Sequence, residues 1–529
     1  MRRASEFDGS KIDALFADLD QGSGPGAAVG IAIGGKPVYR KGYGLASMEL
    51  PVVLSPSIRM RIGSTTKHFT ALAYMLLCEE GKAGIDDPLG KYLPELNPVT
   101  HTVTTRQLMT NTSGLRDTCD IRVHLQGKMG RRATRADLVS LYRDIDDVHA
   151  VPGSAWIYNN GGWVLLTAVI ERLTGQPFEE AMLSRIFEPL GMNDTLVRAW
   201  DNDFIPNSAT PHTLNSEGGL ERLFWDLDFA GAGTIASTVD DMLRWCANME
   251  AHVVGNAATW AAIKTPQVLP NGASTCYGLG LFNGRYRGVD ILHHPGGYTG
   301  CGSQLIKVPA AGLDVVVLAN SDGANCIGLA YSILDATLPN LDPIKKSVAG
   351  SIATGVFRSP ATGRIAHLFA NEGQQVIAID AMELPFERNE AGVLWPTVES
   401  GHFRRAVTLI GDSDKPSALH LSDFGVADEL LQVRSDEGPA AAAIVGHYRS
   451  DSTGTEVEIA VSGGDSLLRS TGRFGSIQYR LERLMGGVWQ ATTLEAAAPH
   501  RVVLAFEDAG RGFHFSAFAT RSLPFKRVD

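Results

Sequence analysis

The sequence predicts an α+β domain followed by two antiparallel all-β domains. At 529 residues the chain is too long for one ordinary core, so two to four domains are expected. Helical and strand patterns are mixed over roughly the first 340 residues, whereas short strands and turns dominate from about Ser347 onward. We therefore expect a mixed domain over 1–340 and two β domains over 343–436 and 437–529.

Hydrophobic periodicity predicts the elements of the first domain. The segment 27–45 holds two strand-like runs around a Gly-Gly pair, which predicts a β-hairpin. From Ser64 onward apolar residues recur every three to four positions, which predicts a helix that ends near Gly81. Residues 163–175 predict a second apolar helix closed by glycine, and the β-branched run 313–320 predicts a buried strand.

The C-terminal part of the sequence has the pattern of β-structure. Residues 455–461 and 501–506 precede glycine-containing turns, and 513–519 alternate well enough for a half-buried strand. Strands spaced in this way are typical of barrels or sandwiches. The region 343–528 is too long for one small barrel, and the alanine-rich stretch 437–446 is typical of a linker between two, with an internal loop as the alternative.

The composition is that of a globular protein and argues against two classes of partner. Hydrophobic residues make up 44% and charged residues 20% of the chain, and the formal net charge is −11. Nucleic acids and anionic membranes favour a basic face, so we expect neither as a partner. No apolar stretch approaches the roughly 18–20 residues that span a bilayer.

The N-terminal sequence and the cysteines indicate a cytoplasmic protein. Two arginines near the start are not followed by the apolar run of a secretory signal, although export of a processed form is left open. The six cysteines are scattered without a C-x-x-C pair. This distribution is more typical of buried thiols than of a disulfide framework or a metal site.

A serine and a lysine three residues apart form the first candidate catalytic motif. Ser64 and Lys67 lie at the start of a predicted helix, where residues i and i+3 share a face. A serine hydroxyl needs a base to become a nucleophile, and a desolvated lysine can be neutral and take its proton. About one S-x-x-K is expected by chance in such a chain, so a solvated helix start with a serine cap explains the motif equally well.

Two further motifs follow later in the chain. Tyr158 and Asn160 come after a turn-like segment; a tyrosine beside a lysine can relay a proton, and an asparagine amide can orient substrate. His294, Gly296 and Gly297 lie in a glycine-rich segment whose backbone a ligand can approach closely. Taken singly, a core-edge tyrosine and a glycine-rich hairpin turn are the simpler explanations.

In combination and in this order, the three motifs resemble those of the penicillin-recognising serine hydrolases. This family includes class C β-lactamases, D,D-carboxypeptidases, esterases and D-aminopeptidases. The resemblance covers about residues 10–335, through segments such as RIGSTTKHFTALA and GAGTIASTVDDMLRW. It implies an antiparallel sheet with helices on both faces and a helical lobe. In length, in the all-β region and in IVGHYRSD (444–451) the chain looks most like the D-aminopeptidase branch, which implies two antiparallel β-barrels after the first domain.

The resemblance also implies a mechanism that needs no metal or organic cofactor. Ser64 would attack a carbonyl carbon to form an acyl-enzyme, while Lys67 and Tyr158 move protons. Asn160 would position the substrate. The backbone N–H groups of Ser64 and Gly297 would form the oxyanion hole.

The third motif narrows the implied substrate. Most β-lactamases and carboxypeptidases carry Lys-Thr-Gly there, which helps to bind a substrate carboxylate. In this chain His294 and Gly296 belong to His-Pro-Gly instead. This difference disfavours substrates that are recognised by a terminal carboxylate and fits D-aminopeptidases. Phe282 departs from that branch because it aligns with an asparagine near the substrate's amino end. An aminopeptidase must hold an ammonium, and Glu495, in the loop 491–500, is our candidate acid. A solvated loop acid is the simpler alternative.

We therefore expect a D-stereospecific aminopeptidase that acts on small molecules or short peptides, and a homodimer is left open. One alternative is an esterase or β-lactamase-like amidohydrolase with another substrate. A non-catalytic peptidoglycan- or peptide-binding homologue is less favoured, because all catalytic residue types are present. The absence of a G-x-S-x-G motif disfavours another common class of serine hydrolase.

Overall fold

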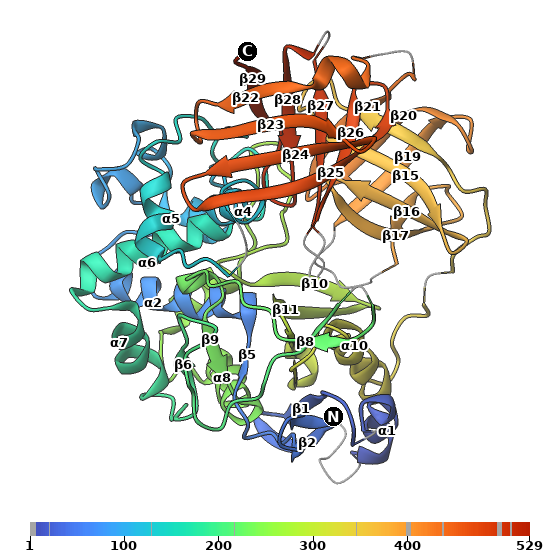
Figure 1. Cartoon of the computed structure of the whole chain (residues 1–529). Helices are drawn as coiled ribbons and strands as arrows, with labels where there is room; N and C mark the ends of the chain where they lie inside the picture. The colour runs from blue at the N-terminus through green and yellow to red at the C-terminus, as the bar shows by residue number, and fades with distance from the viewer. Residues whose placement is uncertain are drawn as a thin grey trace.

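The computed structural model confirms the predicted fold class, with the α+β domain below two β-barrels in the view of Figure 1. No helix within the described stretches is both long and apolar enough to cross a membrane. The structure describes residues 7–20, 22–127, 130–215, 217–344, 346–397, 404–435, 438–494, 500–507 and 510–529.

A six-stranded antiparallel sheet forms the centre of the α+β domain. In sheet order its strands are β10 (Phe282–Tyr286), β11 (Val289–Tyr298), β12 (Cys301–Val308), β13 (Leu313–Ala319), β1 (Ala27–Ile33) and β2 (Lys36–Tyr43). Gly34 and Gly35 join β1 to β2 with φ values of 58° and 72°, which suit a tight hairpin turn, so the predicted hairpin is confirmed. β13 is buried along its whole length, as predicted.

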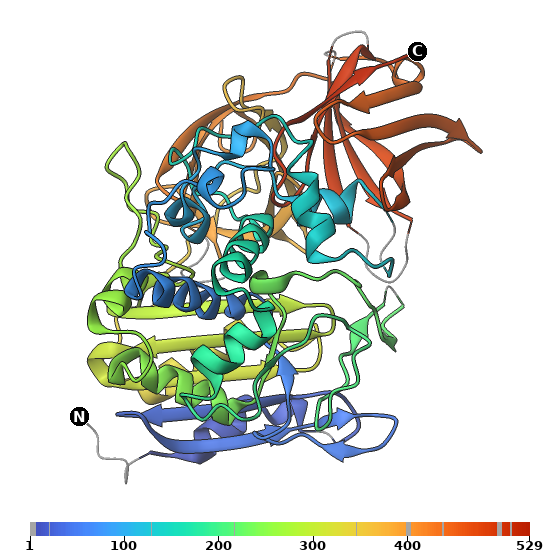
Figure 2. The ribbon, with the colours of Figure 1, turned by 90° about the vertical axis from the view of Figure 1, so that its left-hand side faces the viewer.

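Helices cover both faces of this sheet. α1 (Gly9–Leu15) and α10 (Cys326–Thr337) share one core with one face of the sheet, and α2 (Lys67–Glu79), α8 (Val239–Ala251) and α9 (Ala257–Lys264) share another core with the opposite face. Neighbouring strand residues such as Val316 and Val317 enter these two opposite cores, because side chains alternate along a strand. In Figure 2 the blue α2 lies alongside the strands of the sheet.

A lobe of helices lies between the sheet and the barrels. It contains α3 (Thr105–Met109), α4 (Thr118–His124), α5 (Arg135–Leu141), α6 (Asn160–Thr174) and α7 (Phe178–Met182). The predicted helix over 163–175 is α6, which begins three residues earlier and ends at Gly175 with a φ of 68°. Short strands complete the domain: β3 (Leu45–Ser47) with β4 (Val52–Val53), β5 (Met60–Arg61) with β9 (Ile235–Ser237) and β6 (Leu196–Val197), and β7 (Thr213–Leu214) with β8 (Leu220–Glu221).

The C-terminal region forms two closed antiparallel barrels of eight strands each, so the sandwich alternative is excluded. The first barrel contains β14 (Gly355–Arg358), β15 (Ile365–Asn371), β16 (Gln374–Ile379), β17 (Met382–Arg388), β18 (Leu394–Pro396), β19 (Arg405–Gly411), β20 (Pro416–Asp423) and β21 (Val426–Gln432). The second contains β22 (Gly446–Ser450), β23 (Thr455–Ser462), β24 (Asp465–Gly472), β25 (Gly475–Met485), β26 (Val488–Thr493), β27 (Arg501–Phe506), β28 (Gly512–Ser516) and β29 (Leu523–Arg527).

The predicted β-strands are present with one difference. Residues 455–461 and 501–506 are confirmed as strands, but the strand predicted over 513–519 ends at Ser516. The chain turns there, with the N–H of Ala517 bonded to the carbonyl of Thr520 at 2.8 Å, and Phe518 leaves the barrel core. The domain boundaries themselves stay a prediction.

The end of α4 joins the helical lobe to the second barrel. Leu125, the residue after α4, is buried in the core of that barrel. The hydroxyl of Tyr479 donates to the carbonyl of His124 at 2.7 Å, and that of Ser470 donates to the carbonyl of Leu125 at 2.7 Å. The Gln126 amide donates to the carbonyl of Thr453 at 2.8 Å. The second barrel is therefore held by hydrogen bonds to the end of α4.

Candidate active site

Ser64 lies in a tight turn directly before α2. The predicted helix starts at Lys67, because Gly63–Thr66 form a 3₁₀ turn that leads into it. Gly63 has a φ of 50°, and a Cβ at this position would lie 2.7 Å from the carbonyl oxygen of Gly297. Only glycine allows this approach, which brings the backbone around Ser64 against the third motif.

Lys67 is buried and contacts the Ser64 hydroxyl. Its Nζ lies 3.2 Å from Ser64 Oγ, 2.8 Å from Asn160 Oδ1 and 2.8 Å from the carbonyl oxygen of Ala232. Burial lowers the pKa of Lys67 to about 7, although the charge of Asp117 acts in the opposite direction. A substantial fraction of this lysine is therefore neutral near pH 7 and able to accept a proton.

Tyr158 contacts the same serine from another side. Its hydroxyl donates to Ser64 Oγ at 2.6 Å, and its ring lies 4.7 Å from Lys67 Nζ. Burial raises the pKa of Tyr158 well above its usual value, although the hydrogen bond to Ser64 acts in the opposite direction. The structure thus brings together Ser64, Lys67, Tyr158 and Asn160 from two segments that are some ninety residues apart.

Asp117 fixes the position of the second of these segments, at the start of α6, and no sequence motif pointed to it. Its carboxylate caps α4 at the N–H of Cys119 and accepts from the N–H groups of Asn160 at 2.7 Å and Gly161 at 3.0 Å. Burial, followed by the charge of Asp120, raises the pKa of Asp117 to about 6. Its four acceptor contacts hold the start of α6, and with it Asn160, against α4.

The third motif lies on β11 beside the Ser64 turn. A Cβ on Gly296 would lie 1.9 Å from the carbonyl oxygen of Ile62, whereas a Cβ on Gly297 would meet nothing within 4 Å. Gly296 is therefore needed for the close approach of two backbones, and Gly297 faces open space. Gly297 and Ser64 line the same cleft, as an oxyanion hole built from both would require.

His294 is buried and neutral. Its Nε2 lies 3.1 Å from the hydroxyl of Tyr277 and its Nδ1 lies 2.6 Å from the carbonyl oxygen of Pro295. Burial, helped by the charge of Lys67, lowers the pKa of His294 well below its usual value. Phe282 packs 5.2 Å from the His294 ring. His294 therefore offers no positive charge to a substrate carboxylate.

The cleft beside Ser64 has two lobes of about 490 and 500 Å³. Both are lined by Ser64, Asn160, Trp225, Phe229, Gly297 and His500. The first lobe has the polar side chains of Thr213, Ser321 and Asp322 in its wall beside apolar ones. The second is apolar, lined by Val123, Trp156, Phe282, Phe424 and Phe518, and also holds Asp120, Arg405 and Arg521.

Both barrels contribute walls to the apolar lobe. Phe424 of the first barrel stacks on Trp156 at 3.8 Å between ring centroids, and Phe518 of the second packs edge-on to Tyr158 at 5.8 Å. His500, the last residue of the predicted loop, also lines the cleft, whereas Glu495 lies outside the described residues. No sequence signal identified Phe424 or Phe518, because short β-strands do not reveal which turn reaches another domain.

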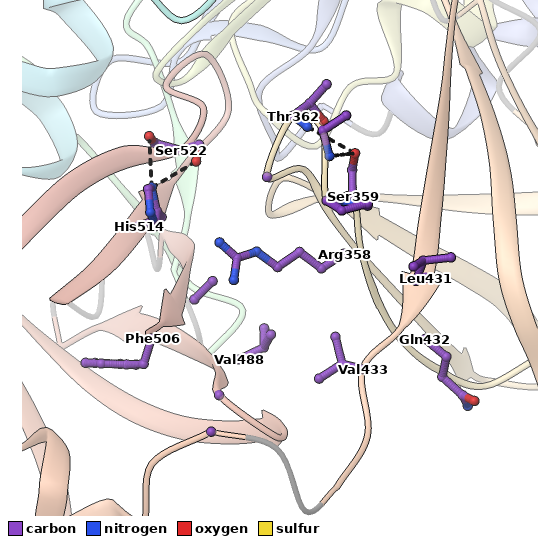
Figure 3. Close-up of a pocket in the computed structure, with 16 residues that line it drawn as sticks. Arg358, Ser359, Thr362, Leu431, Gln432, Val433, Val488, Phe506, His514 and Ser522 are labelled. Atoms are coloured by element: carbon purple, nitrogen blue, oxygen red, sulfur yellow. Dashed lines mark hydrogen bonds between the residues drawn. The ribbon is translucent and has the colours of Figure 1, made fainter. Parts of the chain in front are cut away.

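A further cavity, of about 620 Å³, lies between the two barrels (Figure 3). Arg358 extends into it, and the ring of His514 bonds to Ser522 on its wall. None of the predicted site residues that the structure describes lines it. Among the described residues no group of three or more His, Cys, Asp or Glu side chains is arranged to hold a metal ion. The cleft at Ser64 is therefore the candidate active site.

Comparisons with known proteins find relatives of the first domain and of nearly the whole chain. The family model described as beta-lactamase matches residues 12–337, which include all three motifs. A D-aminopeptidase from Brucella anthropi is 27% identical over 546 aligned positions, covering 99% of this chain and 100% of that protein. A D-aminopeptidase from Gluconobacter oxydans is 25% identical, with 96% of each chain covered. The solved octameric penicillin-binding protein homologue from Pyrococcus abyssi has a TM-score of 0.57 and 21% identity, covering 98% of this chain and 100% of that one.

Proposed function

The chain belongs to the β-lactamase family of serine hydrolases, and we propose that it is a D-stereospecific aminopeptidase that forms an acyl-enzyme on Ser64. The observation that carries the proposal is the contact of one serine hydroxyl with both Lys67 and Tyr158 at the bottom of a cleft. The match to D-aminopeptidases along nearly the whole chain, barrels included, supports the aminopeptidase over other family activities.

Acylation begins with transfer of the Ser64 proton to a neutral Lys67, 3.2 Å away, as Oγ attacks the carbonyl carbon of the substrate. Tyr158 keeps its proton at neutral pH because burial raises its pKa, so it is suited to protonate the leaving amine. Asn160, which accepts from Lys67 at 2.8 Å, orients the lysine and the substrate amide. Each group thus has one defined task in the first half of the reaction.

The negative charge that forms on the carbonyl oxygen needs preorganised donors. The N–H groups of Ser64 and Gly297 are the proposed pair, because Gly63 and Gly296 allow the two backbones to approach closely. In the second half of the reaction water attacks the ester, with Lys67 and Tyr158 exchanging their roles as base and acid. Loss of one such donor typically costs about 3 kcal/mol of transition-state stabilisation.

An aminopeptidase also needs an anion for the free ammonium of its substrate, and we propose Asp120. This side chain lines the apolar lobe, and its buried Oδ2 makes no hydrogen bond to the described part of the chain. Burial alone would raise the pKa of Asp120, but His124, Thr520 and the N–H of Ala519 lower it, so the carboxylate is ionised. Glu495 stays a second candidate for the same task.

The experiment compares the two enantiomers of alanine p-nitroanilide, the N-acetylated D-form, p-nitrophenyl acetate and nitrocefin. We expect the free D-form to be cleaved faster than the N-acetylated D-form. The acetylated form has no ammonium, so it leaves the buried carboxylate unpaired and loses binding energy. Asp120→Asn should lower kcat/KM on D-alanine p-nitroanilide by about 10- to 100-fold and leave p-nitrophenyl acetate within about threefold. Asp144→Asn, at an exposed carboxylate outside the cleft, is the matched control.

Equal rates on free and acetylated D-alanine p-nitroanilide would instead favour the esterase alternative. Turnover of nitrocefin alone would favour a β-lactamase-like amidohydrolase. We also propose a cytoplasmic location, which is supported by six free cysteines, five of them buried.

A further inference from the structure

A cluster of buried charges connects the two barrels beside the apolar lobe of the cleft. Arg364, Asp380, Arg405 and Asp423 come from the first barrel and Arg521 from the second, and none of these side chains is more than 15% exposed. Arg364 contacts Asp380 and Asp423 at 2.8 Å each, and Arg405 contacts Asp423 at 3.0 Å. Both carboxylates therefore already have close cationic partners.

Arg521 is the third guanidinium on these two carboxylates and contacts them less closely. Its nearest atoms lie 3.6 Å from Asp380 and 3.6 Å from Asp423, beyond hydrogen-bond range. Its buried Nε makes no hydrogen bond within the described residues. The carbonyl oxygen of Arg521 accepts from Arg116 at 2.8 Å, which fixes the backbone while the side chain lines the cleft.

The electrostatics of this site favour an anion. Burial and the neighbouring guanidinium of Arg364 lower the pKa of Arg521 to about 10, although the two aspartates act in the opposite direction. Arg521 is still charged at neutral pH, and a buried charge without a hydrogen-bonded partner is costly. A planar guanidinium matches a carboxylate with two parallel hydrogen bonds.

We propose that Arg521 binds the C-terminal carboxylate of the substrate, so that short D-aminoacyl peptides with a free carboxyl end are preferred over their amides. This inference rests on the proposed aminopeptidase function. Tyr158 lines the same lobe as Arg521 and does not line the first lobe, so the amine that it protonates leaves on the side of Arg521. In a short peptide this leaving amine carries the C-terminal carboxylate. Asp120 lines the lobe of Arg521 as well, so both charged ends of a short peptide enter it.

The cation of this proposed carboxylate site does not come from the third motif. His294 is neutral and both its ring nitrogens contact other groups of the protein, so it cannot supply the cation. Arg521 supplies it from the second barrel, in a lobe that has the aromatic rings of Trp156 and Phe518 in its wall. Apolar surroundings lower the local dielectric constant and so strengthen an ion pair between a substrate and a guanidinium.

The test compares D-alanylglycine with D-alanylglycinamide, which differ only in the terminal carboxylate. We expect the wild-type protein to cleave the acid with a kcat/KM at least tenfold above that of the amide. Arg521→Gln should reduce this ratio to about one, through a higher KM for the acid, while D-alanine p-nitroanilide is cleaved within about threefold of wild type. Arg480→Gln, at an exposed arginine of the same barrel, should keep the wild-type ratio.

A wild-type ratio near one overturns the proposal whatever the variants do, and so does an unchanged ratio in Arg521→Gln. If Arg521→Gln loses activity on D-alanine p-nitroanilide as well, Arg521→Lys is tested in its place, because it keeps the positive charge. The acid-to-amide ratio of Arg521→Lys should be about fivefold below that of the wild-type protein. If the wild-type protein cleaves only esters, the proposed function fails, and inhibition of ester hydrolysis by N-acetylglycine and N-acetylglycinamide then tests Arg521 alone. Equal inhibition by the two compounds would reject carboxylate binding.

Discussion

At the scale of single residues, burial has opposite effects on the two groups beside Ser64. A buried lysine loses its charge more easily, whereas a buried tyrosine gains one less easily. The pKa of Lys67 falls to about 7 and that of Tyr158 rises, so the same buried surroundings suit Lys67 to the proposed role of base and Tyr158 to that of acid. Neutral His294 adds no further charge to this pair.

The pKa of Lys67 predicts how activity depends on pH. Protonated Lys67 cannot accept the serine proton, so kcat/KM should fall about tenfold for each pH unit below the pKa of about 7. Activity should rise through pH 7 and fall again above about pH 8, where the α-amino group of the substrate loses the charge that Asp120 is proposed to bind. A rate profile on D-alanine p-nitroanilide between pH 5 and 9 measures this directly. A flat profile over that range would mean that Lys67 is not the base.

Replacement of the predicted nucleophile should abolish turnover without disturbing the fold. Ser64→Ala leaves no hydroxyl for attack, and the Ser64 side chain makes no capping hydrogen bond in the turn before α2. We expect less than 1% of wild-type activity, estimated from catalytic serine variants, and a melting temperature close to wild type. Lys67→Ala should be similarly inactive and Tyr158→Phe severely impaired. More than a few per cent activity in folded Ser64→Ala would reject the assignment.

At the scale of secondary structure, the site depends on two backbones that touch. The turn before α2 and strand β11 approach so closely that there is no room for a side chain at Gly63 or Gly296. At Gly297 there is room for a side chain. Asp117 performs the corresponding task between α4 and α6 through hydrogen bonds to backbone N–H groups. Side chains of three motifs can meet because these elements are held together at the level of the main chain.

The two neighbouring glycines provide a matched pair of variants. Gly296→Ala would place a Cβ 1.9 Å from the Ile62 carbonyl oxygen, so the turn must shift at a cost of about 1–3 kcal/mol. Gly297→Ala meets open space and should melt like wild type. Thermal unfolding should show a decrease of roughly 2–10 °C for Gly296→Ala. Equal melting temperatures for the two variants would contradict the close approach of the backbones.

At the scale of the whole molecule, both barrels contribute walls to the candidate active site. Leu125 of the helical lobe is buried in the core of the second barrel, and Phe424 and Phe518 bring one aromatic wall from each barrel to the cleft. A barrel on a flexible tether would have neither contact. The second barrel therefore limits the space beside Ser64 as well as stabilising α4.

Removal of the second barrel should change specificity. Truncation after residue 436 deletes His500 and Phe518 from the cleft, so we expect higher activity on bulky esters and N-acylated substrates. It also deletes Ala519 and Thr520, which help to keep the proposed ammonium site Asp120 ionised, so we expect lower activity on D-alanyl amides. Kinetics with both substrate classes measure this change.

The truncated chain also exposes Leu125, so a truncated Leu125→Ser protein and size-exclusion chromatography control for aggregation. A monodisperse truncate with the full-length preference would show that the barrel has no part in specificity. In the full-length protein Leu125→Ala should cost about 2–5 kcal/mol of stability, because it leaves a cavity in the barrel core.

The sequence by itself determined the fold class and the three motifs. Periodicity located the hairpin at Gly34, the helix after Ser64 and the buried strand β13, because these patterns reflect local geometry and burial within one element. The order of S-x-x-K, Y-x-N and H-x-G identified the family. The predicted start of the helix at Ser64 lies three residues before the observed start of α2 at Lys67. A 3₁₀ turn and an α-helix have similar apolar spacing at their junction, so the sequence does not distinguish them there.

Only the tertiary structure decided what surrounds Ser64. Asp117, Asp120, Phe424, Phe518 and Arg521 carry no motif, and their importance arises from contacts between segments up to about four hundred residues apart. The same holds for the pKa of Lys67, because desolvation depends on what packs around a side chain and not on its sequence neighbours. A sequence records which residue types are available for chemistry, whereas the packing of distant elements determines which of them meet and which are charged.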